Sequence, residues 1–143
     1  MPALDTNVLV RYIVQDDPSQ LAAARRLISR CVAKGTTLFV PVTVVLELEW
    51  VLRSSFAFGK GDVLITLSNL FSAAELSFES ERALEVALHL FREGSADFAD
   101  CLHVALATQA GVQPLWTFDK GASKISGAHL LAKARFGIES QPN

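Results

Sequence analysis

The sequence is poor in cysteine and has no long apolar run. Its two cysteines, Cys31 and Cys101, are not part of a CxxC motif. Two such thiols give neither a disulfide framework nor a zinc motif, and their apolar, helix-like surroundings predict buried free thiols. The first residues, MPALDTNVLVRY, lack the basic start and apolar run of a signal peptide. No apolar run approaches the roughly 20 residues of a membrane span, so we expect a cytoplasmic protein without membrane contact.

An excess of positive charge is also missing. Lys and Arg number 13 against 15 Asp and Glu, which gives a net charge of -2. This balance excludes a protein that binds nucleic acid through charge alone, so a nucleic-acid enzyme of this composition needs a local basic rim or metal ions. Hydrophobic residues make up 50% and charged residues 20% of the 143 residues. These values are typical of a compact globular chain, and we expect a single domain over 1–143.

Short apolar runs alternate with helical patterns along the chain. Strands are predicted at 3–5, 36–41, 73–78 and 113–119, with a last short strand or turn at 127–132. Helices are predicted at 7–14 with Thr6 as cap, 16–35 with Asp17 as cap, 43–56, from 59 onward, 80–94 with Ser80 as cap, and 97–111. This alternation predicts an α/β fold, in which helices flank a short, mostly parallel sheet.

Acidic residues stand where the predicted strands end. Asp5 and Asp119 directly follow strands, and Glu47 lies one turn into the helix after the second strand. Asp97 and Asp100 lie in the first turn of the helix before the strand that ends at Asp119. Ligands of open parallel sheets bind beyond the carboxyl ends of the strands, so we expect these acids at one rim.

Each acid also has a simpler interpretation. Asp5 and Asp97 could be helix caps, and Asp119 could belong to an ordinary turn. Glu47 and Glu49 lie ~200° apart around a helix, so one is expected to face the core and the other solvent. The convergence of four segments favours a metal site, because crowded carboxylates repel one another and a hard divalent cation removes that cost. Mg²⁺ or Mn²⁺ held by carboxylates suggests phosphodiester chemistry.

These residues give the chain a resemblance to the PIN-domain family, and within it to the VapC-type toxins of type II toxin–antitoxin systems. The motifs that carry it are LDTNVLVRY at 4–12, VVLELEWVL at 44–52, DFADCLHVALA at 97–107 and TFDK at 117–120. The resemblance spans roughly the whole chain. It implies a three-layer α/β/α fold with a short, mostly parallel central sheet flanked by helices.

The resemblance also implies roles for individual residues. It implies that one or two Mg²⁺ or Mn²⁺ ions are held for cleavage of single-stranded RNA by Asp5, Glu47, Asp100 and Asp119. Asp97 is an additional acid, expected as an outer or second-metal ligand. Hydrogen bonds that position the acids or water are expected from Thr6, Asn7 and Thr117. The resemblance further implies a homodimer and inhibition by a small VapB-like antitoxin, often through an Arg that competes for the place of the metal.

The remaining polar and aromatic residues have patterns of their own. His103 completes a DxxDxxH spacing, yet it lies ~120° from Asp97 around a helix, so we expect a packed, hydrogen-bonded histidine. Trp50 and Trp116 are expected in the core. Phe56 and Phe58 fall in an expected loop, where they could be exposed and could meet an antitoxin helix or a second subunit. RNA phosphate contacts are expected from Arg11, Arg53 and Lys120, with Lys60 and Lys124 as further rim candidates, whereas Arg25, Arg26 and Arg30 are expected to form a solvated face.

Two further function classes stay open beside the ribonuclease toxin. One is another carboxylate–metal phosphoryl hydrolase or a DNA nuclease on an α/β fold. An aspartyl-phosphate phosphatase would place a second Asp two residues after Asp5, where this chain has Asn7. The other is a binding module without chemistry, in which the acids serve only as caps.

Overall fold

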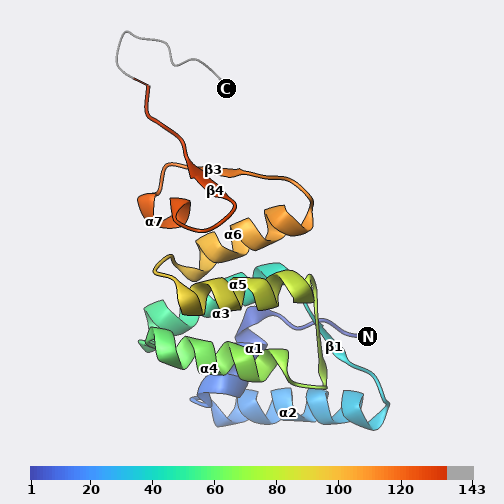
Figure 1. Cartoon of the computed structure of the whole chain (residues 1–143). Helices are drawn as coiled ribbons and strands as arrows, with labels where there is room; N and C mark the ends of the chain where they lie inside the picture. Colours follow the sequence, from blue (N-terminus) through green and yellow to red (C-terminus); the bar gives the residue numbers. More distant parts are fainter. Residues whose placement is uncertain (135–143) are drawn as a thin grey trace.

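The computed structural model describes residues 1–134 of the chain as a helix-rich α/β protein (Figure 1). The helices are α1 (Thr6–Val14), α2 (Pro18–Ala33), α3 (Val42–Phe56), α4 (Lys60–Phe71), α5 (Glu81–Glu93), α6 (Phe98–Gln109) and α7 (Lys120–Ser123). The strands are β1 (Leu38–Val40), β2 (Leu76–Phe78), β3 (Leu115–Thr117) and β4 (Ala128–Leu130). Within this part of the chain, no helix has the length and apolar character needed to cross a membrane.

The helices begin where the sequence supplies caps. The Asp17 side chain accepts a hydrogen bond from the Gln20 amide at 3.1 Å, and Pro18 fills the first position of α2, where its missing N–H costs nothing. Gly35 follows α2 with a φ of +67°, a conformation that glycine adopts without strain. Thr6 is not the cap of α1, because Asp5 takes that role and accepts from the Thr6 amide at 2.7 Å. Ser80 stands at the cap position of α5 but makes no side-chain cap hydrogen bond.

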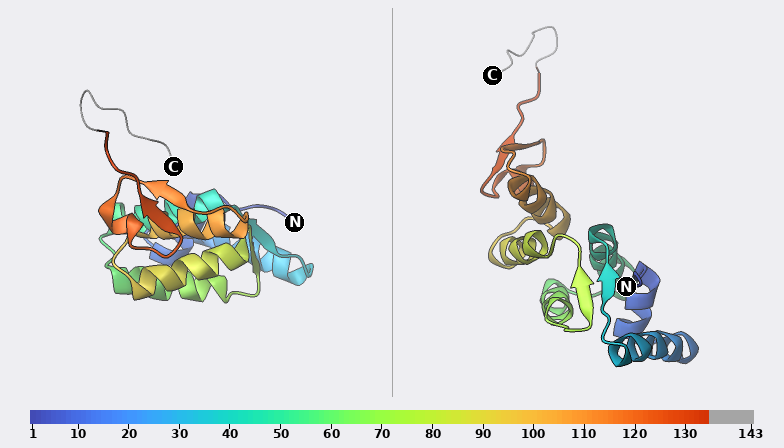
Figure 2. Two further views of the ribbon diagram at one scale, coloured as in Figure 1. Left: turned by 45° about the horizontal axis from the view of Figure 1, so that its top comes forward. Right: turned by 90° about the vertical axis from the view of Figure 1, so that its right-hand side faces the viewer.

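The strands form two separate parallel pairs. β1 pairs with β2, Ala3 forms a parallel bridge to Phe39 of β1, and β3 pairs with β4. Helices α5 and α6 lie between the two pairs in the views of Figure 1 and Figure 2. The family fold class and the last strand at 128–130 are as the sequence predicts. The expectation that Asp5 and Asp119 border one continuous sheet is wrong for residues 1–134, because α5 and α6 pack between the pairs.

A core of aliphatic and aromatic side chains joins the helices to the strands. Helix α5 contributes its apolar face, and Phe91 meets Phe98 at the start of α6 edge to face, with ring centroids 5.9 Å apart. Both cysteines are buried free thiols, as predicted. Burial, with the nearby Asp97 and Asp100 charges, raises the pKa of the Cys101 thiol to about 11, so the thiol is neutral at pH 7.

Four aromatic residues lie elsewhere than the sequence predicts. Trp50 is 59% and Trp116 53% exposed, so the expectation that they belong to the core is wrong. Trp50 occupies the outer side of α3, opposite buried neighbours, and Trp116 points away from the core beside His129 of β4, at a ring distance of 5.6 Å. Phe56 and Phe58 are partly buried instead of exposed, because both rings pack against the hydrophobic core at the end of α3.

Candidate active site

The first group of predicted site residues joins the start of α1 to α3. Asp5 lies just after the Ala3 bridge and is exposed. The buried Thr6 hydroxyl donates a hydrogen bond to a carboxylate oxygen of Glu47. Glu47 is exposed whereas Glu49 is 1% exposed, so the prediction that these two acids face opposite environments is confirmed. Thr6 thereby holds the Glu47 carboxylate toward the helix that begins at Asp5.

The second group consists of three aspartates at the starts of α6 and α7. Asp97 caps α6 and accepts from the Asp100 amide at 2.9 Å. Asp119 caps α7, accepting from the Ala122 amide at 3.0 Å, while its own amide donates to the Thr117 hydroxyl at 3.0 Å. The simpler interpretation of Asp5 and Asp97 as caps therefore holds, and Asp119 caps the short helix α7 instead of belonging to an ordinary turn. Each of these hydrogen bonds uses a single carboxylate oxygen, Oδ1, so the second oxygen can still bind a ligand.

Asp100 has the clearest electrostatic signature in this group. Partial burial raises the pKa of its carboxyl, and the Asp97 charge and hydrogen bond and the Asp119 charge raise it further. The ionised form of Asp100 is thus disfavoured by its surroundings. A cation near Asp97, Asp100 and Asp119 would relieve this repulsion, and oxygen-only donors are those that Mg²⁺ and Mn²⁺ prefer.

The structure does not gather all the predicted ligands into one cluster. Within residues 1–134, no three His, Cys, Asp or Glu side chains lie close enough together to hold a metal ion. Helix α3 packs against α6, so the α1/α3 group and the α6/α7 group lie on neighbouring helices. The donor chemistry of the two groups fits a hard divalent ion, whereas the site made of four acids remains a prediction.

Arg53, a predicted RNA contact, is held by an acid that the sequence left without a role. Its Nε donates to Oε2 of the buried Glu49, and its Nη2 donates to Oε1 at 3.1 Å. The hydrogen bond to Glu49 raises the pKa of the Arg53 guanidinium against a lowering by burial, and the Asp97 charge contributes to the rise. The Glu-x-x-x-Arg spacing within an apolar helix is the sequence signal for this pair.

The other residues predicted to contact RNA or to position the acids differ in whether their side chains already have partners. Arg11 is occupied, with Nη1 on Asp16 at 2.7 Å and Nε on Gln20 at 2.8 Å. Asn7 is exposed and lines a groove of about 330 Å³ between α1 and α2. Lys120 is exposed at the start of α7.

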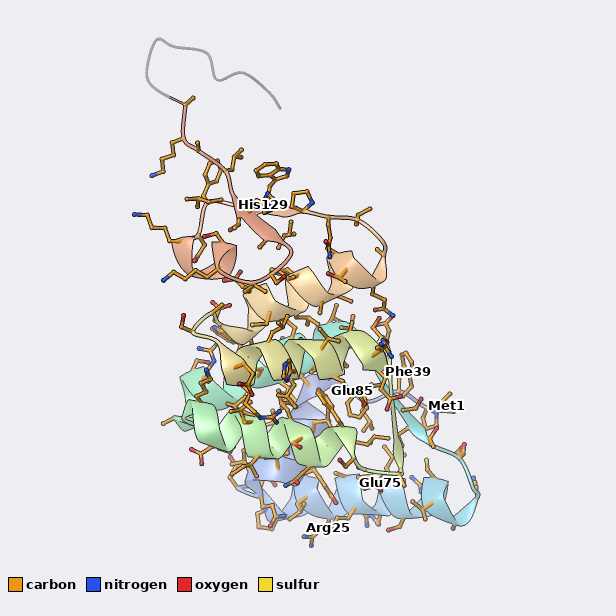
Figure 3. All side chains as sticks on the ribbon, in the orientation of Figure 1. Met1, Arg25, Phe39, Glu75, Glu85 and His129 are labelled. Atoms are coloured by element: carbon orange, nitrogen blue, oxygen red, sulfur yellow. The ribbon has the colours of Figure 1, made fainter. Side chains whose placement is uncertain are left out.

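Two further basic groups can be placed. Lys60 is not a free rim residue, since its Nζ donates to the Gly94 carbonyl at 2.7 Å and lies 4.8 Å from the Phe91 ring centroid. The arginines of α2 line an exposed hollow with Ser29, and Figure 3 shows Arg25 directed away from the body of the molecule. This placement fits the solvated face that the sequence predicts.

His103 does not have the environment expected for it. It is exposed on α6 instead of packed, because the buried side of that helix is formed by Phe98, Cys101, Leu102 and Ala105. His89 and His129 are exposed, as predicted, and Figure 3 shows His129 on β4.

Comparison with known proteins adds the family. The sequence model of the PIN domain matches residues 3–128. A VapC ribonuclease of Aquifex aeolicus (strain VF5) is 22% identical over 125 residues, which cover 87% of this chain and 92% of that protein. The PIN match takes in the LDTN, ELEWVL, DFAD and TFDK segments and every acid of the candidate site. The chain therefore belongs to the PIN domain family.

Proposed function

We propose that this protein is a Mg²⁺- or Mn²⁺-dependent endoribonuclease toxin that cleaves single-stranded RNA and is neutralised by a small VapB-like antitoxin. The observation that carries the proposal is the set of acids from four segments of a PIN domain, each with at least one carboxylate oxygen free of helix capping. The resemblance to a VapC ribonuclease supports the RNA substrate and the antitoxin partner.

The residues proposed to hold the metal are Asp5, Glu47, Asp100 and Asp119, with Asp97 as an additional ligand. The bound ion would supply a water of lowered pKa and neutralise charge on the scissile phosphate. Thr6 orients Glu47, and Thr117 fixes the backbone at Asp119. Asn7 is proposed to hold water or an acid by hydrogen bonding. Since no three candidate ligands within residues 1–134 are already close enough to hold an ion, a site that uses both groups requires their carboxylates to move closer together.

RNA is proposed to reach the acids along a rim that carries Arg53 and Lys120, with Arg11 at the α1/α2 groove. Arg53 and Lys120 are exposed beside the acid groups, and a phosphate could bind there without displacing a core contact. Arg11 would have to leave Asp16, so we assign it the smallest share of the contact. We further propose that residues 1–143 act as one cytoplasmic domain and that two copies form a homodimer.

Purified protein and labelled single-stranded RNA provide the test. We expect cleavage with Mg²⁺ or Mn²⁺ and none with EDTA. Asp100→Asn should abolish cleavage, whereas Asp62→Asn, a matched change at the start of α4 on a residue that accepts from the Gly59 amide, should leave it intact. If Asp100→Asn cleaves as fast as the parent protein, the site assignment is wrong.

Two other outcomes would favour the alternatives. Cleavage of single-stranded DNA in preference to RNA would indicate a DNA nuclease, and release of phosphate from a small phosphomonoester would indicate a phosphatase. Binding of RNA without any cleavage would indicate a module in which the aspartates serve only as caps, as they do in the structure.

A further inference from the structure

Glu49 is a charged residue in an environment that normally excludes charge. It is 1% exposed on α3, among the buried side chains of Val45, Leu48 and Leu52. A buried carboxylate is costly unless it is paired and hydrogen-bonded, and an apolar residue of similar size would usually stabilise such a site better. The reason for a charge at this position therefore lies in the partner that Glu49 binds.

What Glu49 holds is the guanidinium of Arg53. Both carboxylate oxygens are used, one by Nε and one by Nη2 of the same arginine, a fork that fixes the plane of the guanidinium. An arginine has five N–H donors, and within residues 1–134 Arg53 makes no hydrogen bond other than these two. Its Nη1 and one Nη2 hydrogen remain available, and its side chain is 40% exposed.

The position of this pair connects it to the candidate site. Helix α3, which carries Arg53, packs against α6, and the Asp97 charge stabilises the positive charge of Arg53. The only ion pair that Arg53 makes in the described part of the chain is nevertheless with Glu49. Asp97 instead accepts a hydrogen bond from the Asp100 amide. The guanidinium thus lies beside the acids of α6 with free N–H donors, and the buried carboxylate of Glu49 fixes its position.

We propose that Glu49 is a positioning residue that fixes Arg53 as a preformed binding group for an RNA phosphate beside the α6 acids. This inference rests on the proposed function and names a substrate contact within it. An RNA backbone that approaches Asp97, Asp100 and Asp119 meets repulsion, and a fixed guanidinium offsets it with a planar donor pair suited to phosphate oxygens. Because Glu49 holds the arginine in advance, less side-chain freedom is lost when RNA binds.

The test measures binding of a short, labelled, mixed-sequence single-stranded RNA by fluorescence anisotropy. The parent is Asp5→Asn in the presence of Mg²⁺, so that cleavage does not interfere. Arg53→Gln should raise Kd roughly tenfold, as expected for one lost charge-assisted contact. The slope of log K against log salt should fall by about 0.7, the value for one phosphate contact on a single strand. Arg82→Gln, which removes the same charge from exposed α5, should change neither quantity.

Two more variants separate positioning from folding. Arg53→Gln leaves Glu49 buried without its partner, so the double variant Glu49→Gln/Arg53→Gln removes both charges and keeps the net charge of the chain. It should fold and show the same weak binding as Arg53→Gln. Glu49→Gln alone should keep the arginine but raise Kd several-fold, and in the cleavage assay it should raise KM more than it lowers kcat.

The outcomes distinguish this inference from the proposed function. If the parent and the Arg53 variants bind RNA with equal Kd and equal salt slope, Glu49 and Arg53 are only a structural pair and the inference is wrong, while the nuclease proposal stands. If the unsubstituted protein does not cleave RNA and the Asp5→Asn parent does not bind it, both are wrong.

Discussion

The Thr6 hydroxyl donates a hydrogen bond to the Glu47 carboxylate and so connects the first residue of α1 with the second turn of α3. Thr6 is 3% exposed, whereas Glu47 is exposed. A buried donor therefore orients an acid that solvent, or a metal ion, can reach. The neighbouring Asp5 accepts from the Thr6 amide through one carboxylate oxygen only, so Asp5 and Glu47 each keep one oxygen without a hydrogen bond to Thr6.

The Thr6→Val variant should separate the effect of Glu47 orientation on cleavage from the effect of the hydrogen bond on stability. Valine preserves the shape of threonine and removes the hydroxyl, so Glu47 loses its donor and samples other rotamers. We expect cleavage of RNA to fall several-fold, with a loss of about 1 kcal/mol in the free energy of unfolding. Steady-state cleavage and urea unfolding measure the two effects. Thr6→Ser should retain both, and full activity of Thr6→Val would show that this hydrogen bond does not serve the site.

Asp100→Asn should stabilise the metal-free protein at neutral pH. The folded state raises the pKa of Asp100 above its unfolded value, so its contribution to stability is fully present below the unfolded pKa and is lost as the pH rises through the folded pKa. Asparagine cannot ionise, so the Asp100→Asn variant does not lose this stability as the pH rises. Urea unfolding in EDTA should show a more stable variant at pH 7, and the difference should vanish below pH ~3.9, where both forms are neutral. An equal or lower stability of the variant at pH 7 would contradict the repulsion inferred here.

Much of the fold follows from local signals in the sequence. Caps, helical periodicity and glycine placement predict α2, α5 and α6 well, since Asp17, Asp97 and Gly94 mark their ends. The strands of three residues also lie within the predicted apolar runs. What the sequence does not specify is how these strands pair, because strands of three residues are too short to carry a register signal.

The sequence shows where the candidate acids lie along the chain, and it says less about how they are arranged in space. Acids after strands are visible in the sequence, and their capping role was among the interpretations. The expected environment of His103 was wrong because DxxDxxH spacing does not say which face of α6 is buried. The sequence does not assign a role to Glu49, because its burial and its pairing with Arg53 become evident only once α3 is packed.

Trp116 should report the approach of the two acid groups when metal binds. It lies on β3, three residues before Asp119, and is half exposed. A site that draws Asp119 toward Asp5 should shield this indole from water. In a Trp50→Phe variant, whose single tryptophan is Trp116, Mn²⁺ or Mg²⁺ should reduce quenching by acrylamide. The same titration on a variant that also carries Asp119→Asn should show no change, and metal-independent quenching of the first variant would argue that the two groups stay apart.

Asp97 allows capping and ligand binding to be separated, because asparagine caps a helix as well as aspartate but lacks its charge. Asp97→Ala should lower the free energy of unfolding by about 1 kcal/mol, since the Asp100 amide loses its acceptor. Asp97→Asn should keep the stability of the parent protein. If Asp97 also contributes its charge to metal binding, both variants should need more Mn²⁺ for half-maximal cleavage. An asparagine variant with parental stability and parental Mn²⁺ dependence would show that Asp97 is only the cap of α6.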